Sequence, residues 1–281
     1  MVSKIIDGKL LSDSIKEKIK VEVSNLKKRP GLAVIIVGDD AASQIYVKNK
    51  HKACELVGIN STNYSLDKNI KEVELLNLIN KLNTDKTVHG ILVQLPLPKH
   101  INEEKVINAI SPIKDVDCFT KQNVGAMNIF ADYNSILPAT PKGCVKLIES
   151  TGIDLNGKHA VIIGRSNIVG KPMASLLLQK NCTVTICHSK TMDLKKITKQ
   201  ADILVAAIGK ASFVKKDMIK KGTIVIDVGM NRVDGKLYGD VDFENVKKIS
   251  AFITPVPGGV GPMTIAMLLE NTLLAYKNQE K

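Results

Sequence analysis

Serine, tyrosine and lysine side chains recur at helical spacing in the segment that follows Gly38. Ser43, Tyr46 and Lys50 are three and four residues apart, which places them on one face of a helix. A lysine amine can act as a general base near neutral pH when its pKa is lowered. The spacing therefore predicts a proton-handling lysine beside an aromatic ring. The alternative is a surface lysine beside a half-buried tyrosine.

Two further polar features follow apolar runs. Gln94 ends one such run before a Leu-Pro-Leu-Pro turn, and a buried amide there needs hydrogen-bond partners. It could bind a substrate or simply cap backbone groups. Asp115 and Asp117 alternate around Val116, so at the end of a strand both carboxylates would share one side. A solvated acidic turn is the alternative interpretation.

A glycine-containing turn joins an apolar run to a helical pattern in the second half of the chain. The segment from His159 to Pro172 reads HAVIIGRSNIVGKP, with Gly164 at the turn and Gly170 opening the helix. Such a unit presents backbone N–H groups and the positive end of a helix dipole to a pyrophosphate. The pattern departs from G-x-G-x-x-G, because Ser166 occupies the second glycine position and one extra residue precedes Gly170. It predicts a dinucleotide site, and an α/β unit that binds no nucleotide is the alternative.

The residues after the next apolar run indicate which dinucleotide binds. Residues 183–187 form the expected second strand, and an NAD-binding chain has Asp or Glu at its end for the ribose 2′-hydroxyl. Here His188 and Ser189 stand at that place, while Arg165 and Ser166 stand in the glycine turn. A guanidinium and hydroxyls without a carboxylate favour a 2′-phosphate. The sequence therefore predicts NADP rather than NAD as the cofactor.

The composition limits the class of protein. The chain has 281 residues, of which 44% are hydrophobic and 24% charged, and no apolar run approaches the roughly 20 residues of a membrane helix. The N-terminal residues lack a signal core, so we expect a cytoplasmic protein without a membrane partner. Five cysteines without C-x-x-C or zinc spacing predict reduced thiols and no metal site. A net charge of +12 suggests nucleic-acid binding, but the lysines are spread in pairs with few aromatic residues, which favours a solvated basic surface.

Strand and helix patterns alternate along the chain and predict an α/β protein with parallel sheets in two domains. Expected strands span residues 32–37, 62–66, 88–93, 160–163, 183–187, 203–207, 223–228 and 251–253. Expected helices span residues 8–28, 43–57, 70–82, 102–110, 140–150 and 263–276, with another after Gly170. Ligands bind beyond the carboxyl ends of parallel strands, so residues 38–43, 94–98 and Asp117 should share one rim. Residues 120–138 lack periodicity and are expected to join the domains.

Nine short motifs occur in an order that resembles one enzyme family over essentially the whole chain. They are SQIYVKNK at 43–50, VQLPLP at 93–98, KDVD at 114–117, PATPKG at 138–143, GRSNIVGKP at 164–172, CHSKT at 187–191, DVGMN at 227–231, GDVDF at 239–243 and TPVPGGVGPMT at 254–264. Together they are similar to the bifunctional methylenetetrahydrofolate dehydrogenase/cyclohydrolase family. Single motifs of this kind are weak signals, whereas nine in order are specific.

The resemblance implies a fold, two reactions and an assembly. It implies an N-terminal catalytic domain at residues 1–138, completed by the C-terminal helix at 263–281, and a Rossmann-type NADP-binding domain at 139–262, with the folate in the cleft between them. It implies oxidation of methylenetetrahydrofolate with NADP⁺, followed by hydrolysis of the methenyl product to 10-formyltetrahydrofolate. It also implies a cytoplasmic homodimer with tetrahydrofolate derivatives as partners. A dehydrogenase without cyclohydrolase activity and a non-catalytic NADP-binding protein are the alternatives.

The resemblance also implies roles for individual residues. Lys50 would be the general base, Gln94 would orient its amine, Tyr46 would stack on the folate, and Asp117 would accept hydrogen bonds from the pterin. The implied substrate-binding residues are Ser43, Tyr46, Val93, Gln94, Leu95, Pro96, Asp117, Pro257, Gly258, Gly259 and Val260. The implied cofactor-binding residues are Thr140, Gly164, Arg165, Ser166, Val169, Gly170, His188, Ser189, Ala207, Gly209 and Gly229, with Arg165, Ser166 and Ser189 on the 2′-phosphate.

Two positions depart from the family pattern. Cys118 follows KDVD where the family usually has glycine, and Ala139 replaces the usual cysteine of the Pro-Cys-Thr-Pro motif. We expect either that the backbone at Cys118 keeps φ below zero or that a small residue suffices there. Loss of the thiol at Ala139 should be tolerated.

Overall fold

The computed structural model describes residues 3–130 and 135–280. Two structural units form, unit 1 from residues 1–12 and 140–264 and unit 2 from residues 13–139 and 265–281. Helices α1 (Gly8–Ser24), α6 (Ala139–Glu149) and α10 (Val260–Gln279) contain the points where the chain passes from one unit to the other. The last helix therefore supplies residues to both units, as its expected crossing back to the first domain required.

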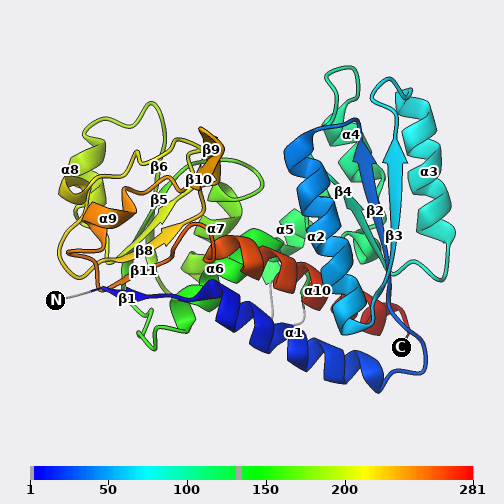
Figure 1. Cartoon of the computed structure of the whole chain (residues 1–281), viewed down its shortest axis with the longest axis horizontal. Helices are drawn as coiled ribbons and strands as arrows, with labels where there is room; N and C mark the ends of the chain where they lie inside the picture. The colour runs from blue at the N-terminus through cyan, green and yellow to red at the C-terminus, as the bar shows by residue number, and fades with distance from the viewer. Residues whose placement is uncertain (1–2, 131–134, 281) are drawn as a thin grey trace. The chain divides into compact units, whose positions relative to one another are not determined.

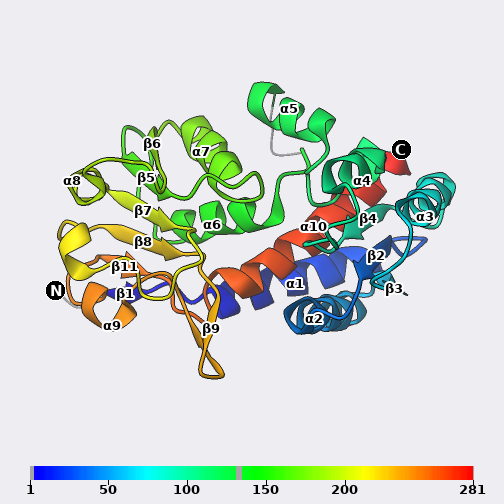
Figure 2. The same ribbon diagram turned by 90° about the horizontal axis from the view of Figure 1, so that it is seen from above.

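Unit 2 contains a three-stranded parallel sheet in the order β3-β2-β4 (Figure 1). Its strands are β2 (Gly31–Val37), β3 (Asn60–Leu66) and β4 (Gly90–Val93), and its own helices are α2 (Ala41–Val57), α3 (Glu72–Thr84), α4 (Glu103–Ala109) and α5 (Lys121–Phe130). All seven residues of β2 are buried, because a central parallel strand is covered on both faces. Helices α2 and α4 lie on opposite faces of this sheet (Figure 2).

The core of unit 2 follows the alternation of side chains along β2. Ala33, Ile35 and Val37 point to one face and pack with Leu75 and Ile79 of α3 in a single apolar cluster. Leu75 and Ile79 are four residues apart and therefore lie on one side of the helix. This packing fixes the sheet that carries the carboxyl ends of β2 and β4.

Unit 1 contains a six-stranded, all-parallel sheet in the order β1-β11-β8-β7-β5-β6. Its strands are β1 (Lys4–Ile5), β5 (His159–Ile163), β6 (Thr183–Cys187), β7 (Ile203–Ala206), β8 (Ile224–Asp227) and β11 (Phe252–Ile253). Helices α7 (Gly170–Gln179), α8 (Leu194–Thr198) and α9 (Phe243–Val246) connect them, and β9 (Asn231–Val233) and β10 (Lys236–Tyr238) form a separate antiparallel hairpin. Short 3₁₀ helices cover Pro112–Lys114 in unit 2 and Lys216–Met218 here.

Strand order reverses next to β5 in unit 1. The chain leaves β5 through α7 to β6 on one side, and then continues with β7 on the other side. A doubly wound sheet binds its ligand at the carboxyl ends of the two strands that flank such a reversal. The fold therefore places the dinucleotide site beyond β5 and β7.

Several elements differ from the expectations drawn from the sequence. Residues 120–138 were expected to be an irregular connection, but α5 occupies Lys121–Phe130; residues 131–134 lie outside the described part. The expected first domain began at residue 1, whereas Lys4–Ile5 pair with β11 and belong to the unit 1 sheet. The segment ending at Asp117 is not a strand, because only Asp115 forms an isolated bridge, to Ile91.

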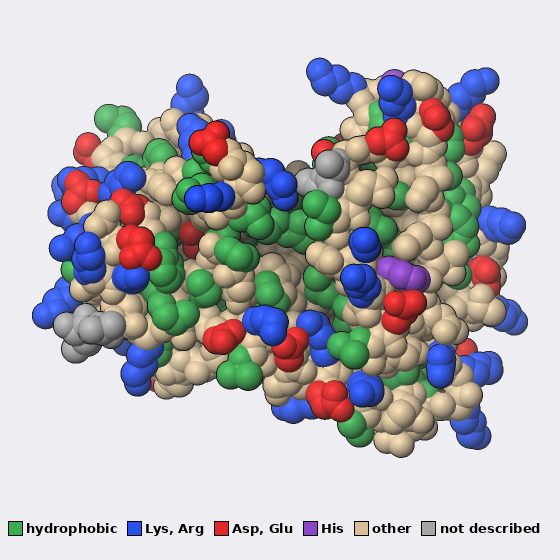
Figure 3. Space-filling model, viewed as in Figure 1, with side chains coloured by type: hydrophobic (Ala, Val, Ile, Leu, Met, Phe, Trp, Pro, Cys, Tyr) green, Lys and Arg blue, Asp and Glu red, His purple; other side chains and the backbone are tan. Residues whose placement is uncertain are grey.

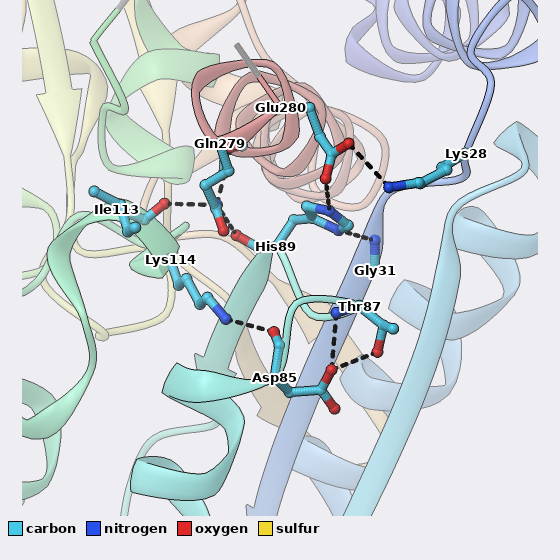
Figure 4. A network of polar contacts seen from close by, with 10 residues as sticks. Lys28, Gly31, Asp85, Thr87, His89, Ile113, Lys114, Gln279 and Glu280 are labelled. Carbon is cyan, nitrogen blue, oxygen red and sulfur yellow. Dashed lines mark hydrogen bonds and ion pairs between the residues drawn. The ribbon is translucent and has the colours of Figure 1, made fainter.

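A buried histidine joins the end of α10 to the unit 2 sheet (Figure 4). The Gly31 N–H donates to His89 Nδ1 at 2.9 Å, so the neutral ring carries its proton on Nε2, which lies 3.7 Å from Glu280 Oε1. The His89 ring also meets the Tyr276 ring edge-on, with centroids 4.7 Å apart. Burial lowers the pKa of His89, partly offset by Glu280, and Lys114 and Lys28 lower it further.

This arrangement predicts a stability that falls in mild acid. A histidine whose folded pKa is below its ordinary value of about 6.5 stabilises the fold fully above that value. The contribution is lost as the pH falls from there through the lower folded pKa, because the unfolded chain then binds the extra proton. Urea unfolding at pH 5 to 8 should show this slope, and His89→Asn, which keeps an acceptor for Gly31, should flatten it. Glu280→Gln should extend the slope to lower pH; an unchanged slope in His89→Asn would contradict this role of His89.

Basic and acidic side chains alternate on the face of the molecule seen in Figure 3. Ion pairs such as Lys220–Asp202 and Lys105–Glu72 hold part of this charge. None of the helices in the described part of the chain is long and apolar enough to cross a membrane.

Candidate active site

The amine of Lys50 and the amide of Gln94 meet in unit 2. Lys50 Nζ donates to Gln94 Oε1 at 3.0 Å, joining the middle of α2 to the residue that follows β4. Gln94 is fixed at both ends, because its N–H donates to the Ile35 carbonyl at 2.8 Å and its Nε2 to the Leu95 carbonyl at 2.9 Å. The N–H groups of Lys50 therefore face the oxygen of a pre-oriented amide.

Lys50 lies in surroundings that favour its neutral form. Its residue surface is only 7% exposed, and the resulting desolvation lowers the pKa of Lys50, partly offset by the negative charge of Asp117 and by Cys54. A neutral amine can accept a proton, whereas an ammonium cannot. The lysine that helical spacing predicted to handle protons is therefore buried, with its amine on an oriented amide.

Asp117 lies within electrostatic reach of Lys50 on the turn that follows the Pro112–Lys114 helix. Burial raises the pKa of Asp117 to about 6, with Lys50 opposing this shift and Asp115 adding to it. At neutral pH most of the population is ionised and can accept hydrogen bonds from a pair of N–H donors. Lys50, Gln94 and Asp117 therefore form one cluster from three separate parts of unit 2.

Ser43 and Tyr46 lie on the same inward side of α2 as Lys50, as predicted. The Ser43 hydroxyl and N–H donate to Asp40 Oδ1 at 2.7 and 2.8 Å, so Ser43 belongs to the N-terminal cap of the helix. Tyr46 is half-buried, and that burial raises its pKa. The helix ends at Gly58, whose φ of 83° is the left-handed conformation expected at that position.

The segment after β4 has the abrupt course that its prolines predicted. Val93 is buried and ends the strand, the Leu95–Pro96 peptide is cis, and Pro96 is exposed. A cis bond before proline turns the chain sharply. Of residues Val93, Gln94, Leu95 and Pro96, Gln94 contacts Lys50, whereas Val93 packs in the apolar cluster with α3.

Backbone packs tightly against backbone at the reversal of strand order in unit 1. A Cβ on Gly164 would lie 2.2 Å from the Ala207 carbonyl oxygen, and a Cβ on Gly170 would lie 2.2 Å from the Gly164 carbonyl oxygen. Gly164 also has φ of 135°, where a side chain is strained. Glycine at both places lets β5, the start of α7 and the end of β7 meet, as a dinucleotide site requires.

The first turn of α7 and the end of β6 carry the polar groups expected to bind phosphate. Ser166 Oγ accepts from the Val169 N–H at 3.1 Å and from the Gly170 N–H at 3.4 Å, so it occupies the anion-binding end of the helix. Arg165 and Ser189 are exposed. The His188 N–H donates to Thr191 Oγ1 at 2.8 Å, which fixes the turn after β6.

Two buried carboxylates organise the loops beyond β7 and β8. Asp240 accepts the consecutive N–H groups of Ile208, Gly209 and Lys210 at 2.5, 3.0 and 2.9 Å. Asp227 accepts from the N–H groups of Gly229, Asp240 and Val241 at 3.0, 2.8 and 2.9 Å, and burial raises the pKa of Asp227 to about 7. The loops containing Gly209 and Gly229 are thus positioned by side chains to which the sequence assigned no role.

Features of the sequence could have indicated that Asp227 and Asp240 are buried and hydrogen-bonded. Asp227 and Asp240 stand in the DVGMN and GDVDF motifs, and Asp227 ends an apolar run. A buried acid at the end of an apolar strand must find donors. Gly229 and Gly239 stand beside them, because Cβ atoms there would lie 2.3 and 1.8 Å from the two carboxylates.

The remaining implied residues also belong to unit 1. Thr140 Oγ1 and Thr264 Oγ1 lie 3.0 Å apart. The Val256–Pro257 peptide is cis, Gly258 has φ of 105°, and its carbonyl accepts the Lys9 N–H at 2.9 Å. A Cβ on Gly8 would lie 2.0 Å from the Gly259 carbonyl oxygen, so the starts of α1 and α10 pack closely before Val260.

The two departures from the family pattern have different structural outcomes. Cys118 has φ of 58°, so the expectation of a negative φ is wrong; a residue other than glycine is held in the left-handed region at about 1–2 kcal/mol of strain. Its side chain is fully buried. Ala139 is buried at the start of α6.

Comparison with known sequences decides the family. The sequence model described as "Tetrahydrofolate dehydrogenase/cyclohydrolase, catalytic domain" matches residues 6–117, and the one described as "Tetrahydrofolate dehydrogenase/cyclohydrolase, NAD(P)-binding domain" matches residues 138–280. The chain belongs to this tetrahydrofolate dehydrogenase/cyclohydrolase family. The Lys50 cluster falls within the first match, and the Gly164 turn within the second.

Individual members of the family are similar over their whole length. A "Bifunctional protein FolD" of Acetivibrio thermocellus is 56% identical over 285 residues, covering 100% of this chain and 99% of that protein. The crystal structure of the bifunctional enzyme from Campylobacter jejuni has a TM-score of 0.96 and 55% identity, covering 98% of this chain and 99% of the other. The Trypanosoma brucei enzyme, solved with NADP and an inhibitor, has a TM-score of 0.96 and 38% identity over 100% and 99% of the two chains.

Metal ligands do not gather in the described part of the tetrahydrofolate dehydrogenase/cyclohydrolase chain. Among residues 3–130 and 135–280, no three His, Cys, Asp or Glu side chains are grouped so that they could hold a metal ion. The five cysteines, at 54, 118, 144, 182 and 187, are all unbridged and buried.

Proposed function

We propose that this chain oxidises 5,10-methylenetetrahydrofolate to 5,10-methenyltetrahydrofolate with NADP⁺ and then hydrolyses the product to 10-formyltetrahydrofolate. The observation that carries the proposal is the buried Lys50 amine, of lowered pKa, held 3.0 Å from Gln94 Oε1 beside Asp117. Family membership supplies the substrate class, and the cluster supplies the acid–base chemistry that the hydrolysis needs.

In the hydrolytic step Lys50 acts as the proton-transfer group. Its neutral amine removes a proton from the water that attacks the methenyl carbon, and the resulting ammonium returns that proton to the ring nitrogen as its bond to this carbon breaks. The remaining hydroxyl proton passes to solvent as the formyl C=O forms. A positively charged substrate lowers the pKa of a neighbouring lysine further. Gln94 accepts a hydrogen bond from the amine and thereby directs its lone pair, since the amide is itself held by Ile35 and Leu95.

The residues at the strand reversal of unit 1 fit NADP. When bound, the nicotinamide accepts the hydride in the oxidation. The positive end of the α7 dipole suits the pyrophosphate. Arg165, Ser166 and Ser189 offer a guanidinium and hydroxyls to the 2′-phosphate, and no carboxylate stands at the end of β6 to bind a free 2′-hydroxyl.

Tyr46 and Asp117 bind the folate in this proposal. Tyr46 stacks on the aromatic part, and Asp117 accepts hydrogen bonds from the paired N–H groups of the pterin. Asp117→Ala should weaken folate binding by roughly 1.5–3 kcal/mol, the range for one hydrogen bond to a charged group. Fluorescence titration with a folate analogue measures this. The control Glu74→Ala, an exposed acid on α3, should leave affinity unchanged; unchanged affinity in Asp117→Ala would remove the contact.

Absorbance of the methenyl intermediate tests the function directly. The chain should form it from methylenetetrahydrofolate with NADP⁺ and consume it when it is supplied alone, and turnover with NADP⁺ should exceed turnover with NAD⁺. Formation without consumption would identify a dehydrogenase only. Neither reaction would leave a non-catalytic NADP-binding protein, and a clear preference for NAD⁺ would contradict the 2′-phosphate site.

A cytoplasmic homodimer that binds neither nucleic acid nor membrane completes the proposal. Five unbridged, buried thiols fit a reducing compartment. The interspersed surface charge in Figure 3 offers no basic stripe for nucleic acid on that face. Light scattering of the purified chain measures the assembly, and a monomer would contradict it.

A further inference from the structure

The carboxylate of Asp115 accepts hydrogen bonds from several residues of the turn that follows it. Asp115 is 1% exposed. Its Oδ1 accepts the Phe119 N–H at 3.2 Å, and its Oδ2 accepts both the Thr120 N–H at 2.9 Å and Asn123 Nδ2 at 3.0 Å. Three donors from the next eight residues thus converge on one side chain.

The turn that these bonds close contains an unfavourable backbone conformation. Cys118 has φ of 58° although it has a side chain, and that side chain is fully buried. Its N–H donates to the Asp115 carbonyl at 3.4 Å. The carboxylate of the same Asp115 also accepts the N–H groups of Phe119 and Thr120, so Asp115 is bonded to the backbone at Cys118 and at the two residues after it.

Asp117 lies in this turn between two neighbouring residues, Val116 and Cys118, whose positions depend on hydrogen bonds. On one side the Val116 carbonyl accepts Asn271 Nδ2 at 2.8 Å, and on the other side Cys118 is held through Asp115. The direction of the Asp117 carboxylate follows from both. The charge of Asp115 also acts on Asp117, raising its pKa, while Lys50 acts in the opposite sense.

We infer that Asp115 is the positioning residue that holds the left-handed turn at Cys118 and so presents Asp117 to the substrate. The inference rests on the proposed function, in which Asp117 binds the folate. Asp115 itself does not touch the substrate. Because this chain has cysteine rather than glycine at 118, the turn depends on Asp115 more than a glycine-containing turn would.

The decisive experiment compares Asp115→Asn in two backgrounds. An asparagine amide has one acceptor oxygen and one NH₂ group. In Asp115→Asn the NH₂ group would therefore face a donor, either the Phe119 N–H or those of Thr120 and Asn123. KM for methylenetetrahydrofolate should rise about 10- to 100-fold, the loss expected for one charge-assisted contact, with a smaller change in kcat. Glycine adopts positive φ without strain, so Cys118→Gly should retain normal KM and should bring the double variant within about threefold of it.

The pH profile gives a readout that a purely structural role would leave unchanged. Removing the negative charge of Asp115 should lower the pKa of Asp117, so the acidic limb of kcat/KM should move to lower pH in the double variant. Asp67→Asn is the control, since Asp67 also accepts a backbone N–H in unit 2 but is exposed; it should alter neither KM nor the limb. An unchanged KM in Asp115→Asn, or a double variant no better than Asp115→Asn, would overturn the inference.

The failure of the proposed function is distinguishable from the failure of this inference. If Asp117→Ala leaves KM unchanged, the assigned folate contact is wrong. The coupling between Asp115→Asn and Cys118→Gly in the urea midpoint of unfolding still tests the turn, because it needs no substrate. Additive midpoints would show that Asp115 does not hold Cys118.

Discussion

Lys50→Met is expected to abolish cyclohydrolase activity while leaving the fold intact. The substitution removes the amine that accepts the proton but keeps an unbranched side chain of similar volume. Losing one positioned acid–base group lowers such a rate by about 10²- to 10⁴-fold. The substitution removes the positive neighbour of Asp117 and the donor to Gln94, so circular dichroism must show that the variant is folded before its rate is compared. The absorbance of supplied methenyltetrahydrofolate measures the rate.

A matched control exists on the same helix. Lys48 is exposed two residues away on α2, so Lys48→Met removes an equal charge without touching the cluster and should retain full activity. Gln94→Ala should give an intermediate loss, since the amine remains but is no longer oriented. Near-normal cyclohydrolase turnover in a folded Lys50→Met would exclude Lys50 from the mechanism.

The elements predicted from the sequence are those whose local pattern agrees with their burial. The apolar run before Gly38 forms the buried central strand β2, and residues 43–57 fall within α2. Both could be predicted because the spacing of apolar residues along a short segment indicates a strand or a helix. The two-residue strand β1 has no such pattern. It exists because Lys4–Ile5 pair with β11, some 250 residues away in sequence.

The site residues also divide into those that local spacing predicts and those that only the fold brings together. Residue types and helical spacing were enough to predict Ser43, Tyr46 and Lys50 on one side of a helix. The bond from Lys50 to Gln94 joins residues 44 positions apart, and only the parallel sheet brings them together. Of the two alternatives for Cys118, the negative φ was wrong, because no property of cysteine itself indicates a positive φ, and the alternative that a small residue suffices there stays open.

Both units position their loops with a buried carboxylate that accepts several N–H groups. Asp115 does so in unit 2, and Asp240 and Asp227 do so in unit 1. A carboxylate offers about four acceptor sites and can hold a loop that lacks regular backbone pairing. The same arrangement makes each loop vulnerable to loss of one side chain, because several N–H groups then lose their common acceptor at once.

Asp240→Ala is therefore expected to destabilise unit 1. It removes the carboxylate that accepts from the N–H groups of Ile208, Gly209 and Lys210 and from Asn231 Nδ2. These donors are only part-buried, but a hydrogen bond to a charged group contributes about 1.5–3 kcal/mol net, so the total loss in the free energy of unfolding should be at least about 1.5 kcal/mol. Urea unfolding followed by circular dichroism measures it. KM for NADP⁺ should also rise, since the affected loop follows β7, next to the Gly164–Ala207 contact.

Two variants separate this mechanism from a general effect of removing negative charge. Glu244→Ala removes an exposed acid of the same unit, paired with Lys247 at 2.6 Å, and should change stability by no more than about 0.5 kcal/mol. Asp240→Asn keeps one acceptor oxygen and should fall between Asp240→Ala and the unsubstituted chain. A loss below about 1 kcal/mol in Asp240→Ala would contradict the role of this carboxylate, because even one hydrogen bond to a charged acceptor contributes more than that.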